Sequence, residues 1–420
     1  MNVRIFTASI LIVLGLALLG CQTQPNPVPD ASEAVQTPET ATSTPVMTDI
    51  LLPTAPETAI PVPTETASSP SLPAHPVVSG VEIFEFHMVT PARGWAVTRD
   101  QNRLLITSDG GEIWLDVTPS GLEALPEGWT SHGIRPFFLD QDTAWFMPNT
   151  DEEEGIIFHT QDGGDTWMSM SPPFDNATFE FVDREFGYAL VGLGAGAGSH
   201  YVAIYRTVDG GQTWEMVFTH EPELIKALPN GGSKNGLTFK DVDHGWIGGA
   251  IPMDDYFYLF YTEDGGVTWA QEEEIALPGD YGGSMLEVWQ PVFVETGTAF
   301  LPVRAYPPEG GIHLLIYRST DGGENWAFRG AVAEGEAVDF VGPELGWLAA
   351  GSALFQTADG GMTWSTLSAE GIGMGEVFLK VDFVDQLHGW VLTTPDSSTW
   401  ESLKRYRTEN GGENWSLLAP

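Results

Sequence analysis

Short apolar runs separated by turn residues recur along residues 77–420. One unit contains the alternating run LKVDFVD (379–385), which a turn connects to the aromatic run HGWVL (388–392). The third apolar run of a unit is a sequence such as HLLIYR (313–318). Alternation of this length between turn signals is typical of β-strands. Because the pattern contains no convincing helix, it predicts an all-β domain.

One motif follows the third apolar run of every unit. It reads TQDGGDTW at residues 160–167 and occurs seven times, with starts 38 to 57 residues apart. This spacing lies in the range of propeller blades. Each unit reads as strand, turn, strand, loop, strand, motif, strand, so the repeats predict a seven-bladed β-propeller of four-stranded blades. No strand exchange between the termini is evident, unless residues 76–80 add to the last blade.

The acidic position of this motif is expected to form a turn. An Asp side chain accepts backbone N–H bonds in the turn that it begins, and the two glycines supply positive φ. The Trp that follows is expected to wedge between neighbouring blades. A catalytic carboxylate is not needed seven times around a ring, nor is it replaceable by Asn. The motif positions are Asp109, Asp162, Asp209, Asp264, Asp321, Asp359 and Asn410, with Trp114, Trp167, Trp214, Trp269, Trp326, Trp364 and Trp415.

The motif is similar to the Asp box, or BNR repeat, of the form Ser/Thr-x-Asp-x-Gly-x-Thr-Trp. Combined with strands such as RGWAV (93–97), the seven boxes resemble the photosystem II stability/assembly-factor family over nearly all of residues 81–420. The resemblance implies a non-enzymatic propeller that binds a client protein during the assembly of a complex. Asp boxes also occur in sialidases, xyloglucanase-type glycoside hydrolases and sortilin-like receptors.

The first 76 residues are predicted to contain a signal peptide and a tether. Residues 1–20 resemble a bacterial lipoprotein signal peptide, because an apolar run ends in the lipobox LLGC at Cys21, the single cysteine of the chain. The resemblance implies lipidation of Cys21 and a place in the cell envelope, on the extracytoplasmic side of a membrane. Residues 21–76 contain twelve prolines and no Lys or Arg. This composition predicts a disordered, extended tether ahead of the propeller at residues 77–420.

The charge of the chain restricts its partners. Asp and Glu number 58 against 17 Lys and Arg, which gives a net charge of −41. Such a field opposes binding to nucleic acid or anionic lipid headgroups and is compatible with a cationic client. Members of the resembled family are thought to use an arginine-rich face, so their mode of binding is not carried over. A single cysteine excludes internal disulfides and thiolate metal sites.

Catalytic interpretations have weaker support in the sequence. A sialidase needs three convergent arginines, whereas Arg206, Arg318 and Arg407 each precede a box and are expected to pair with nearby acids. A xyloglucanase-like site needs two facing propellers. The run GLGAGAG (192–198) lies between strands instead of opening a helix, unlike a phosphate loop. We therefore predict no catalytic residues, no cofactor and no metal site; a carbohydrate-active propeller, either a sialidase-like hydrolase or a lectin, is the alternative.

Loops on the rim opposite the boxes, here called the loop rim, are the predicted binding face. These loops vary in length and carry aromatics outside the repeat positions. The partner is expected to be a protein client, or else a glycan, with membrane contact only through the lipid anchor. The alternative is that the same residues pack the loops. The candidate residues are Trp129, Tyr256, Tyr281, Tyr306, Trp400, Asp254 and Asp255, together with Glu152, Glu153 and Glu154.

Overall fold

The computed structural model describes residues 75–99, 103–120, 122, 134–148, 155–220, 228–295, 297–397 and 401–419. Contacts divide the chain into two units, Met1–Ala67 and Ser68–Pro420, and the described residues all belong to the second. They form antiparallel strands and a 3-10 helix, η3 (Gly279–Tyr281), and contain no α-helix. No helix within these ranges is long and apolar enough to cross a membrane.

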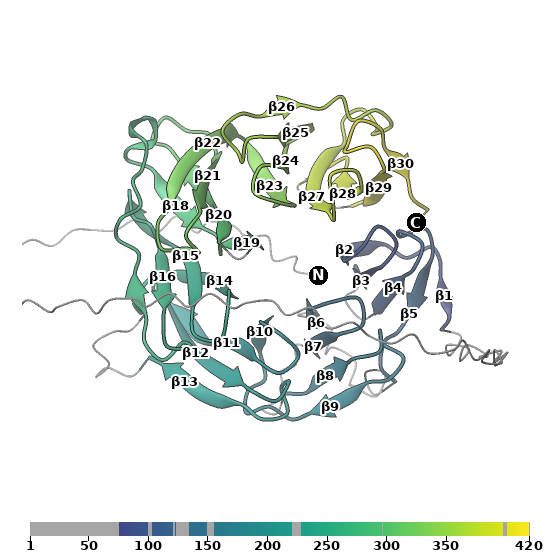
Figure 1. The fold of residues 1–420 in the computed structure, drawn as a ribbon, viewed down its shortest axis with the longest axis horizontal. Helices are drawn as coiled ribbons and strands as arrows, with labels where there is room; N and C mark the ends of the chain where they lie inside the picture. The colour runs from purple at the N-terminus through teal and green to yellow at the C-terminus, as the bar shows by residue number, and fades with distance from the viewer. Residues whose placement is uncertain are drawn as a thin grey trace, which may run out of the picture. The chain divides into compact units, whose positions relative to one another are not determined.

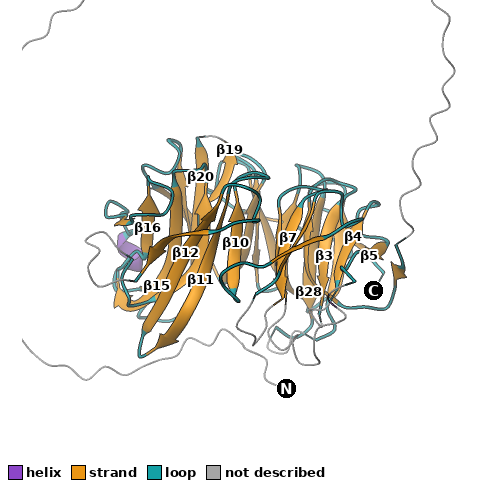
Figure 2. Ribbon diagram, turned by 90° about the horizontal axis from the view of Figure 1, so that it is seen from below, coloured by secondary structure: helices purple, strands orange, loops and turns teal. Residues whose placement is uncertain are grey.

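The strands form successive four-stranded sets in which each strand pairs with the next along the chain (Figures 1 and 2). The first set is β2 (Ile83–Met88), β3 (Gly94–Thr98), β4 (Leu104–Thr107) and β5 (Trp114–Asp116). The second is β6 (Ile134–Phe138), β7 (Ala144–Pro148), β8 (Ile157–Thr160) and β9 (Met168–Met170). The third is β10 (Ala177–Phe181), β11 (Gly187–Gly196), β12 (Ser199–Thr207) and β13 (Glu215–Thr219).

The next two sets share one nine-stranded sheet. They are β14 (Ser233–Phe239), β15 (Gly245–Asp254), β16 (Leu259–Thr262) and β17 (Ala270–Gln271), then β19 (Val292–Glu295), β20 (Thr298–Tyr306), β21 (His313–Ser319) and β22 (Ala327–Ala333). Between them β18 (Met285–Val288) pairs with both β15 and β20. The remaining sets are β23 (Gly335–Phe340), β24 (Gly346–Ala350), β25 (Ala353–Thr357) and β26 (Ser365–Thr366), then β27 (Val377–Phe383), β28 (Gly389–Thr394), β29 (Lys404–Thr408) and β30 (Ser416–Leu417).

These sets are arranged around a ring, with the first strand of each set innermost (Figure 1). The predicted all-β propeller is therefore confirmed. We interpret each four-stranded set as one blade, numbered 1 to 7 along the chain, and call its first strand the inner strand. The count of seven rests on dividing the nine-stranded sheet at β18.

Hydrophobic clusters lie between neighbouring blades. Each cluster combines buried residues from two adjacent sets, for example Trp347 of blade 6 with Phe383 of blade 7. A further cluster combines Phe86 of blade 1 with Trp390 of blade 7, so the last blade packs on the first. Burial of apolar surface between blades is the main term that stabilises such a ring.

The aromatic residue of each second strand makes the central contact between blades. Trp347 stacks on Phe383 of the next inner strand with ring centroids 3.6 Å apart, and Tyr188 stacks on Phe239 at 3.5 Å. Stacked or tilted aromatic pairs of this kind add to the free energy of area burial. The turn GW that precedes many second strands thus places a ring against the next blade.

The junction of the last and first blades uses the same contact together with polar bonds. Trp390 Nε1 donates to the carbonyl of Gly110, 2.8 Å away in the box of blade 1. The amide of Met88 donates to Asp382 Oδ2 at 3.1 Å. The possible exception, in which residues 76–80 add to the last blade, is not found, because β1 (Val77–Val78) pairs with β5, the outer strand of blade 1.

A glycine precedes the second-strand aromatic in five blades, whereas Ala144 and Ala299 hold this position in blades 2 and 5, and in blade 7 close packing requires the glycine. A Cβ at Gly389 would lie 2.3 Å from the ring of Phe383, which is itself held against Trp347. We expect Gly389→Ala to destabilise the propeller by about 1–3 kcal/mol, as overpacked cores do. Chemical denaturation measures the change. Gly342→Ala is the matched control, because a Cβ there meets nothing within 4 Å; equal losses from both variants would contradict the packing explanation.

Candidate functional site

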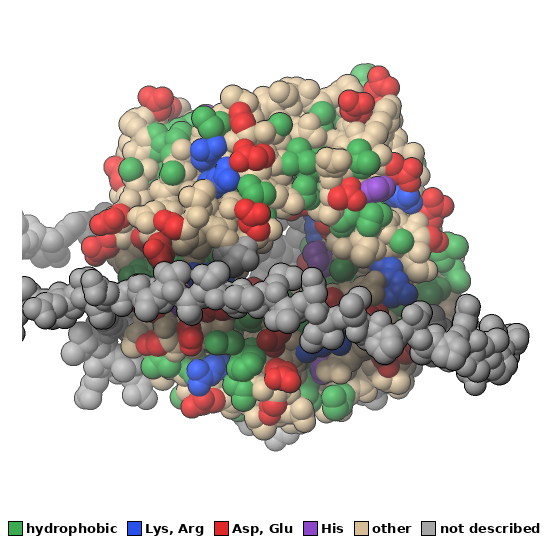
Figure 3. All heavy atoms as spheres, in the orientation of Figure 1, with side chains coloured by type: hydrophobic (Ala, Val, Ile, Leu, Met, Phe, Trp, Pro, Cys, Tyr) green, Lys and Arg blue, Asp and Glu red, His purple; other side chains and the backbone are tan. Residues whose placement is uncertain are grey.

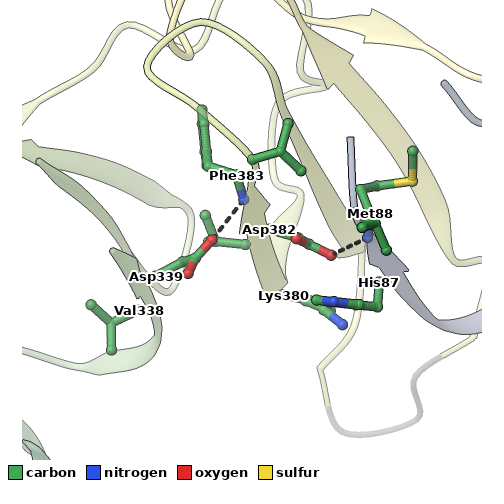
Figure 4. Close-up of a pocket in the computed structure, with 10 residues that line it drawn as sticks. His87, Met88, Val338, Asp339, Lys380, Asp382 and Phe383 are labelled. Carbon is green, nitrogen blue, oxygen red and sulfur yellow. Dashed lines mark hydrogen bonds between the residues drawn. The ribbon is translucent and has the colours of Figure 1, made fainter. Parts of the chain in front are cut away.

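A pocket of about 360 Å³ lies between the inner strands of blades 1, 6 and 7 (Figure 4). Its wall combines β2, β23 and β27 with the residues that follow β2 and β27. The polar lining residues are His87, Asp339, Lys380 and Asp382, and the apolar ones include Met88 and Val338. Inner strands border the axis of the ring, so this is an axial pocket.

Three of the four polar residues of the pocket occupy one repeated register position, and Lys380 is the exception. His87, Asp339 and Asp382 lie directly opposite Trp95, Trp347 and Trp390, the second-strand aromatics of their own blades. Glu180 lies opposite Tyr188 at the same position of blade 3. Directly opposite residues of an antiparallel pair share one face of the sheet. These polar groups therefore sit beside the inter-blade aromatic contacts, at their axial end.

The acidic members of this position tie neighbouring blades together. Asp339 Oδ2 accepts a 2.6 Å hydrogen bond from the amide of Phe383 in blade 7 (Figure 4). Asp382 Oδ2 accepts from the amide of Met88 in blade 1. The carboxyl group of Glu180 is likewise hydrogen-bonded by the amide of Phe239 in blade 4. An amide that would otherwise lack a strand partner at the channel wall is satisfied in each case.

Burial shifts the titration of these groups. Desolvation raises the pKa of Glu180 to about 8. Desolvation, followed by repulsion from Asp382, raises the pKa of Asp339 to about 7. Desolvation lowers the pKa of His87, so its imidazole is neutral at pH 7. The axial wall therefore contains carboxyl groups that exchange protons near neutral pH.

Lys380 does not neutralise the two aspartates directly. Its Nζ donates to the carbonyl of Phe86 and lies 5.0 Å from the centre of the Phe86 ring. Among the described residues, no ion pair within 4.0 Å joins Lys380 to Asp339 or Asp382. The lysine still lowers the pKa of Asp339 through its charge. The pocket thus keeps acidic oxygens beside a lysine that is bound elsewhere, an arrangement suited to holding a cationic group.

The boxes form tight turns on one rim. In blade 2, Asp162 Oδ1 accepts from the amide of Thr166 at 2.9 Å and from the hydroxyl of Thr160 at 2.8 Å. Burial opposes ionisation of Asp162, but the bonds from Thr166 hold its pKa below the usual value. Both box glycines have positive φ in all seven copies. Each box Trp lies in the cluster between its own blade and the preceding one.

The boxes and the first hairpin of each blade share a rim. The first box glycine donates to a carbonyl in that hairpin, as Gly411 does to Leu387 and Gly163 does to Asp142. Inner strands therefore end at the box rim. Because the axial pocket is lined by residues at and beyond those ends, such as Phe383 and Val384, it lies toward the box rim. The sequence had directed attention to the opposite rim.

Several predicted loop-rim residues are brought together where β18 joins two blades. Met285 lies opposite both Asp254 and Tyr306 in the strand register. Asp255 has φ of 59° and accepts a 2.6 Å bond from the amide of Gly283. The hydroxyl of Tyr306 donates to Glu287 Oε2 at 3.1 Å. These residues form a polar loop junction in which most side chains already have partners.

The remaining loop-rim candidates are separate or lie outside the described residues. Tyr256 packs against the cluster of blades 3 and 4 and donates to Gln271 at 3.0 Å. Tyr281 packs against the next cluster and contacts the ring of His313. Trp129, Trp400 and Glu152 to Glu154 lie outside the described residues, as does Cys21. The loop-rim face stays a prediction, and for the tyrosines the packing alternative has direct contacts in its favour.

Every Lys and Arg side chain that the structure describes has an internal partner. Arg206, Arg318 and Arg407 pair with Glu215, Glu344 and Glu409. Lys234 is 5% exposed and its Nζ lies 2.6 Å from the carbonyl of Pro229 and 2.7 Å from that of His200. Others bond box carbonyls, as Arg329 does to Asp359 O. Asp and Glu outnumber Lys and Arg by 58 to 17 in the chain, so the basic residues are too few to pair with most of the acids, and Figure 3 shows acidic side chains spread over the face that it draws.

The sequence reasoning missed the axial pocket. Its signal was an Asp immediately before the inner-strand Phe in VDF, at Asp339 and again at Asp382. The strand alternation assigns this acid to the exposed face, so only its recurrence before the same Phe could have indicated a shared role. Glu180 in FEF is the third example.

Comparison with known proteins gives the following relatives. No family model matches the chain. The photosystem II assembly lipoprotein Ycf48 of Synechococcus sp. (strain CC9902) is 24% identical over 288 residues, which cover 62% of this chain and 79% of that protein. This similarity confirms the expected resemblance to photosystem II assembly factors.

The solved structure of a glycoside hydrolase shows the same fold. The GH74 xyloglucanase from Xanthomonas campestris matches with a TM-score of 0.55 at 12% identity, over 82% of this chain and 56% of the enzyme. YCF48 bound to a D1 peptide matches with a TM-score of 0.47 at 18% identity, over 76% of this chain and 92% of that chain. The likeness to the xyloglucanase shows a shared propeller fold and nothing about chemistry.

The raised pKa of Glu180 predicts a pH-dependent stability. Because the folded state holds this proton more tightly than the unfolded state, the contribution is complete at low pH and is lost as pH rises through about 8. Relative to Glu180→Gln, the free energy of unfolding of the wild type should fall between about pH 5 and about pH 8. Denaturation at several pH values measures the difference. A difference that is independent of pH would show that Glu180 titrates normally.

Proposed function

We propose that this protein is a lipid-anchored, extracytoplasmic scaffold that binds a cationic protein partner and does not catalyse a reaction. One observation carries the proposal: the described Lys and Arg side chains already form ion pairs or hydrogen bonds within the propeller. With 58 acids in the chain, the surface field is left acidic. Such a surface steers basic partners toward the propeller and repels acidic ones.

The sequence relative supports an assembly role over catalysis. Ycf48 is a photosystem II assembly lipoprotein, and the similarity covers most of its length. The identity of the complex assembled is not carried over, since the present chain is acidic and its described arginines are engaged within the ring. In the axial pocket, Asp339 and Asp382 each accept a backbone amide of the next blade. Because these bonds fix the two carboxylates in place, we favour a role in binding over a role in catalysis.

The lipid anchor is part of the proposal. Lipidation of Cys21 would hold the propeller at a membrane, and residues 22–76 would set its distance from the surface. Expressed in a bacterial host, the full chain should partition with membranes, and Cys21→Ser should move it to the soluble fraction. Cell fractionation measures this, with metabolic labelling by a fatty acid as the direct readout. Membrane retention of the serine variant without label would contradict lipidation.

Crosslinked pull-down with the membrane-anchored protein tests the binding role. We expect capture of a protein whose purified form rebinds the propeller directly. Its affinity should fall steeply as salt rises from about 50 to about 300 mM, because the attraction is between exposed charges. A glycan array runs in parallel. Binding of a defined glycan with no protein partner would contradict the proposal and favour the carbohydrate-active alternative.

A further inference from the structure

One carboxylate oxygen in the axial pocket, on Asp382, accepts no hydrogen bond from the described residues. Asp382 is 7% exposed, and the hydrogen bonds of the described residues use only its Oδ2, toward Met88. Asp382 is one of the residues that line the pocket. Figure 4 shows the second oxygen of Asp339 turned away from Phe383 on the neighbouring strand. These oxygens are not among the fully buried side-chain atoms that lack a hydrogen-bond partner, and a carboxylate oxygen can accept a further donor that enters the pocket.

The pocket also has a local excess of negative charge. Asp339 and Asp382 repel each other, which is one reason that the pKa of Asp339 is raised to about 7. Lys380 and the neutral His87 face them, but the ammonium group of Lys380 is bound to Phe86 O. An added cation would relieve this repulsion and stabilise the ionised form of Asp339.

The shape and lining of the pocket fit one long basic side chain. Its volume of about 360 Å³ exceeds that of a single side chain. Met88, Val338 and Val381 offer apolar walls for a methylene stem. A guanidinium group can donate to two carboxylate oxygens at once, while an ammonium group acts as a point charge. His87 keeps exposed surface although its surroundings partly desolvate the imidazole, so the lining can be reached from the axis.

We propose that the axial pocket receives an arginine or lysine side chain of the protein partner, with Asp382 and Asp339 as its receptors. The inference rests on the proposed function, because it assigns the partner's basic residue to a particular site. Arginine is preferred, since its planar group can bridge carboxylates on two neighbouring blades. The site lies toward the box rim, so contact with the loop rim is not required.

Proton linkage gives this site a distinctive signature. The residues facing Asp339 are Asp382, Lys380 and His87, together with the amides of Phe340 and Phe383. Binding of a cation lowers the pKa of Asp339 from about 7, so a proton is released on binding. Affinity should therefore rise from about pH 6 to about pH 8.

Calorimetry on the detergent-solubilised full chain tests the proposal. The probes are the blocked peptides acetyl-Gly-Ser-Arg-Ser-Gly-amide, its lysine form, and its uncharged citrulline form. We expect the arginine peptide to bind at least about tenfold more tightly than the citrulline peptide, a difference of about 1.4 kcal/mol. Measurements in two buffers of different ionisation enthalpy should show proton release. Equal binding of both peptides, or no arginine binding, would overturn the proposal.

Two substitutions and a matched control locate the binding. Asp382→Asn and Asp339→Asn keep an oxygen for the amides of Met88 and Phe383, and each should weaken arginine binding about tenfold and reduce proton release. Glu180→Gln changes the same register position in blade 3, outside the pocket, and should leave binding unchanged. If Glu180→Gln weakens binding as much, the peptide is held by diffuse acidity and the proposal fails. Thermal melts confirm folding, and a variant that fails to fold leaves the two-peptide comparison and proton release in the wild type as the deciding readouts.

The same variants separate this inference from the proposed function. A captured partner that binds Asp382→Asn and Asp339→Asn as tightly as the wild type would refute the pocket assignment while leaving the scaffold role intact. Absence of any protein partner would refute the scaffold role, whatever the peptides do.

Discussion

The ring depends on one repeated contact, in which the aromatic residue of a second strand packs on the inner strand of the next blade. Trp347 against Phe383 and Tyr188 against Phe239 are two of the tightest examples. A four-stranded sheet cannot bury both faces alone, so each blade is stable only when its neighbour covers that ring. Trp390 makes the equivalent contact with blade 1, and this closes the circle without exchange of strands between the termini.

Acidic residues at the axial end of this contact connect structure to function. Glu180, Asp339 and Asp382 occupy one register position and each accepts an amide from the next inner strand. The hydrogen bond satisfies the amide but leaves the carboxylate poorly solvated, which raises the pKa of the first two. Where two such positions adjoin, in blades 6 and 7, their mutual repulsion creates a preference for a cation. In the proposed function, the acidic surface attracts the cationic partner at long range, and the pocket binds one of its basic side chains at short range.

The repeat predicted most of the fold, because turn chemistry and strand alternation are local. Thr-x-Asp-Gly-Gly boxes specify their own turn, as the bonds around Asp162 illustrate, and the glycine of GW specifies close approach. Features that depend on how the blades meet could not be predicted from the sequence. The pairing of β18 with two blades, the outer position of β1 and the pocket at Asp339 and Asp382 all arise from distant segments. A strand acid such as Asp382 reads locally as an exposed residue, and only closure of the ring buries it.

Selective carbon-13 labelling of aspartate gives the most direct test of this account. Carboxyl chemical shifts of Asp339, assigned with Asp339→Asn, report its titration in the intact propeller. The account predicts a midpoint near pH 7, with the amide of Phe383 shifting in the same pH range. An ordinary midpoint near about pH 4 with no response at Phe383 would show that the carboxyl group is solvated. In that case neither the hydrogen bond from Phe383 to Asp339 nor the cation site would exist as described.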